Sequence, residues 1–310
     1  MSQVNFSAAD IKELREKTGA GMMDCKKALT ENAGSLEQAT DWLRKKGLAA
    51  AQKKSGRVAA EGLVVIACND NSSEAAVIEL NSETDFVAKN DKFQALAQKI
   101  ANVSLKTPAD VEVLKAVKLE NGKTVAEDII EHVSVIGENL QLRRCAKISG
   151  DVVISYVHNA VLPTAGKIGV LVAFSSQGDK QVIQKLGKQI AMHIAASRPE
   201  SLNIESLDQN LVNKEKEILT EQAKASGKPD EVIAKMIEGR IRKYYAEVVL
   251  LEQLFVIDGK TQIKQVIEAA SKEAGSPITL TSYVRFQLGE GIEKKEENFA
   301  AEVAAVANNS

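Results

Sequence analysis

The sequence has few aromatic residues, few cysteines and no long apolar stretch, and each shortage excludes a class of protein. Only 4% of the 310 residues are aromatic, so a platform of rings that stacks on nucleic-acid bases is not expected. The three cysteines, Cys25, Cys68 and Cys145, are far apart, which argues against a disulfide framework or a zinc knuckle. The strongly apolar stretch from Ile168 to Phe174 is far shorter than the ~20 residues that cross a bilayer.

Neither sign of charge dominates. Lys and Arg number 40 and Asp and Glu number 42, giving a formal net charge of -2, whereas a protein that coats nucleic acid usually has a basic excess. The N-terminal stretch has no apolar signal core. We therefore expect a cytoplasmic protein that contacts neither nucleic acid nor a membrane directly.

Motifs that carry catalytic chemistry are also missing from the sequence. Gly166-Lys167 lacks the rest of a phosphate-binding loop, and Gly289-Glu290-Gly291 lacks the third glycine of a dinucleotide fingerprint. The histidines, His132, His158 and His193, are separated from one another and from the cysteines, so no metal site is expected. We expect a protein that acts by binding, without catalysis and without a cofactor.

The first 46 residues predict a module of three short helices. Its boundaries are set by capping patterns and glycines, namely Ser7 with Asp10, Gly19-Ala20-Gly21, Met22, Ser35 with Gln38, and Lys45-Lys46-Gly47. So small a core is marginal alone and suits a recruiting module. Residues 47–60 lack a clear apolar stripe and indicate a linker.

From Glu61 the hydrophobic period becomes that of strands, and a strand–turn–strand–helix unit occurs twice, at residues 61–105 and 150–199. The repeat predicts a two-part α+β core with antiparallel sheets, divided into an N-subdomain at 61–149 and a C-subdomain at 150–288. The expected strands are Leu63–Cys68, Ala75–Asn81, Leu140–Ile148, Val152–Val157, Ile168–Phe174 and Leu280–Leu288, and the expected helices surround Phe93–Ile100, Val125–Val135 and Val182–Ala196. Residues 159–166 are expected to form a loop.

Two further segments are predicted to be helical. Residues at about 205–245 are rich in charge and carry two apolar stripes interrupted at Gly227-Lys228-Pro229, which favours a protruding antiparallel hairpin. Residues 289–310 are expected to form a C-terminal module, whose helix places Phe299, Val303 and Val306 on one face.

Two features suit binding better than packing. Phe86 is a large ring in the polar loop Thr84–Asn90, although the ring could also pack on its own helix with Asp85 as the cap. Met22-Met23 follows a glycine turn, and methionine is common on adaptable binding surfaces. The alternative is that these methionines fill the small helical core.

Several segments resemble the bacterial translation elongation factor Ts family. The similar stretches are ELREKTGAGMMDCKKAL at 13–29, NSETDFVAKN at 81–90, IAMHIAASRP at 190–199, SGKPDEVIAKMIEGRIRKY at 226–244, and VRFQLGEGIEK with the following FAAEVAA near the end. They occur in the family's order and cover essentially the whole chain.

The resemblance implies a guanine-nucleotide exchange factor for elongation factor Tu, built from a ubiquitin-associated-like helical module, a two-part α+β core, a coiled-coil hairpin and a C-terminal module. It also implies that Thr84, Asp85, Phe86 and Val87 enter the partner's nucleotide domain and disturb its magnesium site. Further partner contacts implied by the resemblance are Arg15, Met22, Met23 and His193.

Other functions remain open at this point. One is a ubiquitin-associated-like adaptor or chaperone without exchange activity, and another is an enzyme, against which the missing phosphate loop argues. The sequence also leaves open a homodimer or a two-to-two complex with the partner.

Overall fold

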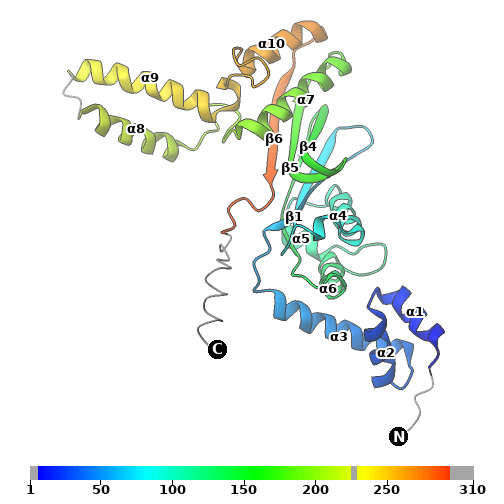
Figure 1. Ribbon diagram of the computed structural model, residues 1–310. Coiled ribbons are helices and arrows are strands. Elements are labelled where there is room, and N and C mark those ends of the chain that lie inside the picture. The colour runs from blue at the N-terminus through cyan, green and yellow to red at the C-terminus, as the bar shows by residue number, and fades with distance from the viewer. Residues whose placement is uncertain (1–5, 225–228, 294–310) are drawn as a thin grey trace.

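A computed structural model describes residues 6–224 and 229–293 as a mixed α+β fold with helical projections at opposite ends (Figure 1). N-terminal helices, an antiparallel sheet covered by helices, and a projecting hairpin follow one another along the chain. The fold class expected from the sequence is therefore confirmed. The helix expected at Phe299–Val306 lies outside the described residues.

Three helices form the N-terminal module: α1 at Ala8–Thr18, α2 at Met22–Glu31 and α3 at Leu36–Lys54. Ser7 and Asp10 make the expected capping box, and Ser35 caps α3 by accepting the Gln38 N–H. The buried side chains of this cluster are Leu14, Cys25, Ala28, Leu29 and Ala39.

The expected end of the third helix at Lys45-Lys46-Gly47 is wrong, because α3 continues to Lys54. Gly47 is buried against Ser134, so packing overrides a local stop signal. Residues 47–54 are thus helical, and the boundary expected at residue 46 falls inside a helix.

Six strands form one antiparallel sheet in the order β3-β2-β1-β5-β4, with β6 paired to β5. Their bounds are β1 Glu61–Cys68, β2 Glu74–Ser82, β3 Gln141–Ser149, β4 Val152–Leu162, β5 Ala165–Ser175 and β6 Thr279–Gln287. β1 and β2 pair along their whole length, and β5 pairs with both β4 and β6. The two halves join through a short pairing of Val64 and Val65 with Gly166 and Ala165. The two parts of the core therefore share one sheet.

The loop expected at residues 159–166 is mostly strand. β4 extends to Leu162 and β5 begins at Ala165, which leaves Pro163-Thr164 as the turn. Asn159 adopts a positive φ of 51°, which asparagine tolerates better than most residues, and the pairing continues beyond it. Asn159, Pro163 and Gly166 are residue types common in turns, and they concealed an exposed hairpin arm in this segment.

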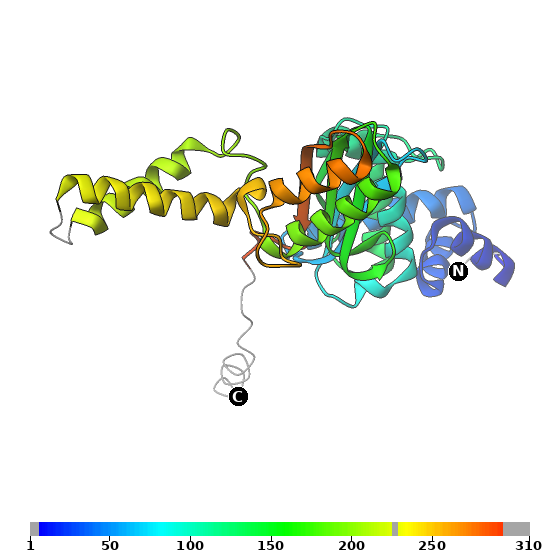
Figure 2. The same ribbon diagram turned by 90° about the horizontal axis from the view of Figure 1, so that it is seen from above.

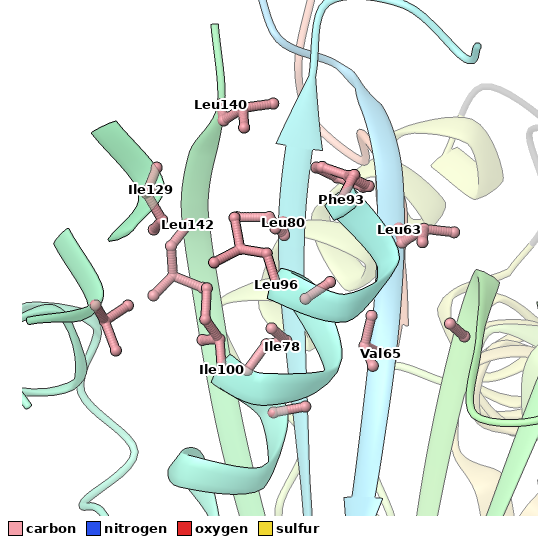
Figure 3. Packing of buried hydrophobic residues seen from close by; sticks show 14 of the residues in the cluster. Leu63, Val65, Ile78, Leu80, Phe93, Leu96, Ile100, Ile129, Leu140 and Leu142 are labelled. Carbon is pink, nitrogen blue, oxygen red and sulfur yellow. The ribbon is translucent and has the colours of Figure 1, made fainter. Parts of the chain in front are cut away.

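Helices cover the sheet in both halves. In the N half, α4 (Asp91–Ser104) packs on β1 and β2, the short α5 (Val111–Ala116) packs on β3, and α6 (Val125–Ile136) packs against α4 and α5. Figure 3 shows this core, in which Leu63, Val65, Ile78, Leu80, Phe93, Leu96, Ile100, Ile129, Leu140 and Leu142 meet. In the C half, α7 (Lys180–Ser197) and α10 (Ile263–Ala274) enclose a second cluster. Sequence patterns did not predict α5 or α10.

A buried carboxylate fixes the end of β6 against the N half. Glu79 has no exposed surface and accepts hydrogen bonds from Arg143 Nη1 at 3.1 Å, Arg144 Nε at 2.5 Å and the Gly289 N–H at 2.9 Å. Removing one partner of such a buried pair typically costs about 3–5 kcal/mol. Gly289 also needs its glycine, since a Cβ there would lie 2.5 Å from the Ala60 oxygen.

The hairpin of α8 (Gln209–Lys224) and α9 (Asp230–Val248) projects from the C half, away from the N-terminal module (Figures 1 and 2). Its base is fixed by buried Leu207, Val212 and Val249. Pro229 precedes α9 as expected, while residues 225–228 lie outside the described part of the chain. No helix among the described residues is long and apolar enough to cross a membrane.

Candidate partner-binding site

The loop between β2 and α4 presents an aromatic ring to solvent. Phe86 is 80% exposed, whereas the next residue, Val87, is buried in the N-half core. Phe93, seven residues further, supplies the fully buried ring of α4. The ring of Phe86 therefore does not pack on its own helix, and the fold does not depend on it.

The base of this loop is fixed to the residues that follow α6. The Thr84 N–H and Oγ1 donate to the two carboxylate oxygens of Glu138, at 2.9 and 2.6 Å. The Asn139 N–H donates to Glu83 Oε1 at 2.6 Å, and Ser82 Oγ donates to the Thr84 carbonyl at 2.9 Å. These bonds, of which the three to carboxylates are charge-assisted, hold the backbone on the N-terminal side of the ring in one geometry.

The C-terminal side of the loop is fixed by a 3₁₀ turn, η1, at Val87–Lys89. The Ala88 N–H donates to the Asp85 carbonyl at 3.2 Å, and the Lys89 N–H donates to the Phe86 carbonyl at 3.1 Å. Asn90 caps α4 by accepting from the Lys92 and Phe93 N–H groups, so the sequence alternative in which Asp85 caps the helix is not observed. Asp85 is exposed beside Phe86, and a preorganised loop loses little entropy on binding.

A second exposed apolar surface lies on the N-terminal module. Met22 and Met23 begin α2 after the extended Gly21 and are 59% and 76% exposed, and Arg15 on α1 is also exposed. The methionines therefore do not fill the helical core. We call Arg15, Met22 and Met23 the methionine surface; its flexible, polarisable side chains suit contact with another protein.

His193 lies elsewhere, buried on α7 in the C half. Its side chain has no exposed surface in this conformation. The ring Nε2 lies 2.8 Å from Gln253 Oε1, and Nδ1 lies 3.2 Å from the Val256 nitrogen, whose N–H it accepts. Nε2 therefore carries the proton and donates it to Gln253. Burial lowers the pKa of His193, the Gln253 hydrogen bond opposes this, and the ring is a neutral structural group.

His193 holds a loop that the sequence analysis missed. Leu254, Val256 and Ile257 are each about half exposed, while Phe255 between them is buried. Asp258 then closes the turn by accepting from the Lys260 and Thr261 N–H groups, which lower the pKa of its carboxyl to about 2. A run of four apolar residues directly before an Asp-Gly turn was the available signal.

An exposed ring on a fixed loop and an exposed methionine surface are features typical of proteins that bind another protein. Sequence comparison shows the family: the chain belongs to the elongation factor Ts family of translation elongation factors, as its motifs indicated. The family profile described as Elongation factor TS matches residues 83–290.

Full-length relatives support the same assignment. Elongation factor Ts of Rhodospirillum centenum is 57% identical over 305 residues, which cover 97% of this chain and 99% of the relative. The protein of the same name from Rhodospirillum rubrum is 56% identical, covering 97% and 98%, and that from Rickettsia bellii is 54% identical, covering 99% of each. The chain therefore spans nearly the full length of these relatives.

Proposed function

We propose that this protein binds elongation factor Tu in its GDP form and promotes GDP release. The observation that carries the proposal is Phe86, a large ring that is 80% exposed on a loop fixed from both sides. A solvent-exposed ring gains nothing for the folded protein alone. Its burial in a partner would be worth roughly 1.5–3 kcal/mol, and this free energy can be used to disturb the partner's nucleotide site.

The mechanism is competition between two ligands of one partner. The factor and GDP weaken each other's binding by the same coupling free energy, and GTP then displaces the factor by the same linkage. A magnesium ion is often the largest local charge in a phosphate site, so a wedge that disturbs its geometry weakens GDP efficiently. In this proposal Phe86 is the wedge, Val87 anchors it, Thr84 fixes its base, and Asp85 brings a carboxylate beside it.

The methionine surface is proposed as a second contact with the same partner. A tethered second contact raises the overall affinity through its effective concentration. Since His193 is buried, we propose that it contributes through the loop that it holds, Leu254 to Ile257.

The remaining expectations belong to the same proposal. The chain needs no catalytic group, cofactor or direct nucleic-acid contact of its own, since the chemistry resides in the partner, and translation takes place in the cytoplasm. We also propose a helical module that ends with α3 at Lys54, in place of the module at 1–46 and the linker at 47–60, followed by core subdomains at 61–149 and 150–288 and a C-terminal module at 289–310. The proposed function is compatible both with a homodimer of this protein and with a complex of two copies of this protein and two of elongation factor Tu.

The direct test is stopped-flow release of a fluorescent GDP analogue from elongation factor Tu, with and without this protein. We expect release to accelerate with the concentration of the factor and to saturate. If the complex formed but GDP release did not accelerate, the protein would be a binding protein without exchange activity. Absence of any complex would favour the ubiquitin-associated-like adaptor instead.

A further inference from the structure

The second half of α3 lies along α6 and connects the N-terminal module to the core (Figure 1). One stripe of α3 makes this contact, because residues three and four apart share a helix face. Its members are Arg44, which pairs with Glu127, Gly47, which touches Ser134, Ala51, which packs on the N-half core, and Lys54, whose Nζ donates to the Gly137 carbonyl at 2.6 Å. We call these contacts the α3–α6 seam.

Gly47 sets how closely the two helices approach. A Cβ at Gly47 would lie 2.7 Å from Ser134 Oγ and 3.7 Å from Ser134 Cβ. Glycine inside a helix costs about 1 kcal/mol relative to alanine, so helix propensity does not favour it here. Close approach at the seam explains its presence.

The ion pair at one end of the seam and the lysine hydrogen bond at the other orient the seam but contribute little to its strength. Arg44 pairs with Glu127, which also closes the capping box of α6 by accepting the Thr124 N–H at 3.0 Å. Lys54 reaches the carbonyl of Gly137, the left-handed C-cap of α6. Arg44 is largely exposed, and exposed pairs stabilise by about 1 kcal/mol or less. The close contact at Gly47 is therefore the part that fixes the geometry.

The seam links the two surfaces proposed to bind the partner. The first half of α3 carries Ala39, Trp42 and Leu43 of the helical core on which α2, and hence Met22-Met23, is packed. At the other side, Glu138 and Asn139 directly follow α6 and hold the backbone of the Phe86 loop. Gly19 adds a second approach, since a Cβ there would lie 3.7 Å from Val135 of α6. Helix α6 is thus a common support for both surfaces.

We propose that the α3–α6 seam is a rigid spacer that sets the separation between the methionine surface and Phe86, and that Gly47 is its positioning residue. This proposal rests on the proposed function, because it concerns how two surfaces engage one partner. A preset separation lets the second contact form at a high effective concentration once the first has formed. A continuous α3 of 19 residues, roughly 28 Å long at 1.5 Å per residue, is stiff enough for this role.

The first test forces the seam apart in the full-length protein. Gly47→Leu places a side chain where Ser134 lies, while both contact surfaces keep their residues. We expect the concentration for half-maximal GDP release from elongation factor Tu to rise about tenfold or more, with the maximal rate at saturation nearly retained. Gly239→Leu is the matched control, because Gly239 lies inside α9 and a Cβ there meets nothing within 4 Å.

The second test closes the seam covalently. Gly47→Cys with Ser134→Cys would place two Cβ atoms about 3.7 Å apart, within the range of disulfides. The exposed Cys68 is replaced by serine in this variant, and its reduced form is the control. We expect the oxidised protein to exchange GDP with the half-maximal concentration of the reduced form, within about twofold.

Two outcomes would overturn the spacer. Exchange lost only on oxidation would mean that the module must leave α6 to reach the partner. A Gly47→Leu protein with an unchanged half-maximal concentration would mean that the seam sets nothing that binding needs. Failure of the unsubstituted protein to release GDP would instead refute the proposed function, so the two failures are distinguishable.

Discussion

The two strand–turn–strand–helix halves of the core share an order of elements but differ in the link from the second strand to the helix. In the N half, residues 83–90 join β2 to α4 and leave the ring of Phe86 in solvent. In the C half, residues 176–179 join β5 to α7, and Gly178 packs on α10, where a Cβ would lie 2.8 Å from Ala274 Cβ. Asp179 caps α7 and its N–H donates to the Ala274 carbonyl at 3.1 Å.

The two links differ in what constrains them: the C-half link serves the fold, whereas the N-half link is available to a partner. The C-half link is shorter, and within it Gly178 packs against Ala274 of α10, so this position is constrained by packing. The N-half link is longer, and its packing is completed by Val87 and by Phe93 on α4. The fold therefore does not need the ring of Phe86. Residues that the fold does not need are free to contact a partner.

The largest effect is expected for Phe86→Ala. Exchange on elongation factor Tu should fall about 30-fold, the equivalent of roughly 2 kcal/mol for an aromatic hot spot. Stability should change by less than about 0.5 kcal/mol, because the ring is exposed in the free protein. Stopped-flow GDP release and a thermal melt measure the two quantities.

Phe93→Ala is the matched control for that variant. The same ring, fully buried on α4, should cost about 3–5 kcal/mol of stability on truncation. If the melting temperature of Phe86→Ala fell as far as that of Phe93→Ala while GDP release stayed normal, the proposal that Phe86 acts as a wedge would be wrong. Chelating magnesium should also shrink the difference between Phe86→Ala and the unsubstituted protein, and an unchanged difference would exclude displacement of the ion as the mechanism.

Sequence patterns predicted the strands of both halves and the helices α4, α6 and α7, but not α5 or α10, against which the C-half link packs. The capping box at Ser7, the apolar runs of β1 and β2, and the stripe of α4 are local signals that packing did not override. The length of α3 and the position of His193 depend instead on distant partners, Ser134 of α6 and Val256 of the loop after η2 (Leu250–Glu252). The sequence alone also left the exposure of Phe86 undecided, because the same residues allow the ring either to pack on its own helix or to point into solvent.

The next effect concerns the support of the exposed link. Glu138→Ala removes both acceptors of Thr84, so the loop should lose its fixed geometry while Phe86 stays in place. We expect exchange to fall about tenfold, the cost of about 1.4 kcal/mol of lost preorganisation. In a Phe86→Ala background the same change should have almost no further effect, since the two act through one ring. Full additivity in this double-mutant cycle would show that Glu138 acts elsewhere.

The C-half link should respond in the opposite way. Gly178→Ala introduces a Cβ 2.8 Å from Ala274 Cβ and 2.9 Å from its carbonyl oxygen, and overpacking of this kind costs about 1 kcal/mol or more. We expect a lower melting temperature with GDP release unchanged for the folded protein. A specific loss of exchange at full stability would mean that the C-half link also meets the partner.

The smallest effect is a pH dependence that comes from His193 in the C half. Burial lowers the pKa of this imidazole below its usual value of 6.5, so the unfolded chain binds a proton more readily than the folded protein does. Its contribution is therefore fully present above pH 6.5 and is lost as the pH falls from 6.5 towards the lower folded pKa. The slope cannot exceed about 1.4 kcal/mol per pH unit for one group.

Urea unfolding at pH 7.5 and 5.5 measures this slope. His193→Gln should be less stable at both values, because the Val256 N–H loses its acceptor, yet it should lose less stability between them than the unsubstituted protein. His158→Gln is the control for removal of an imidazole, since His158 is exposed on β4. An equal slope in all three proteins would show that His193 is protonated as easily in the fold as in the unfolded chain. A buried neutral histidine would then be the wrong description of the C half.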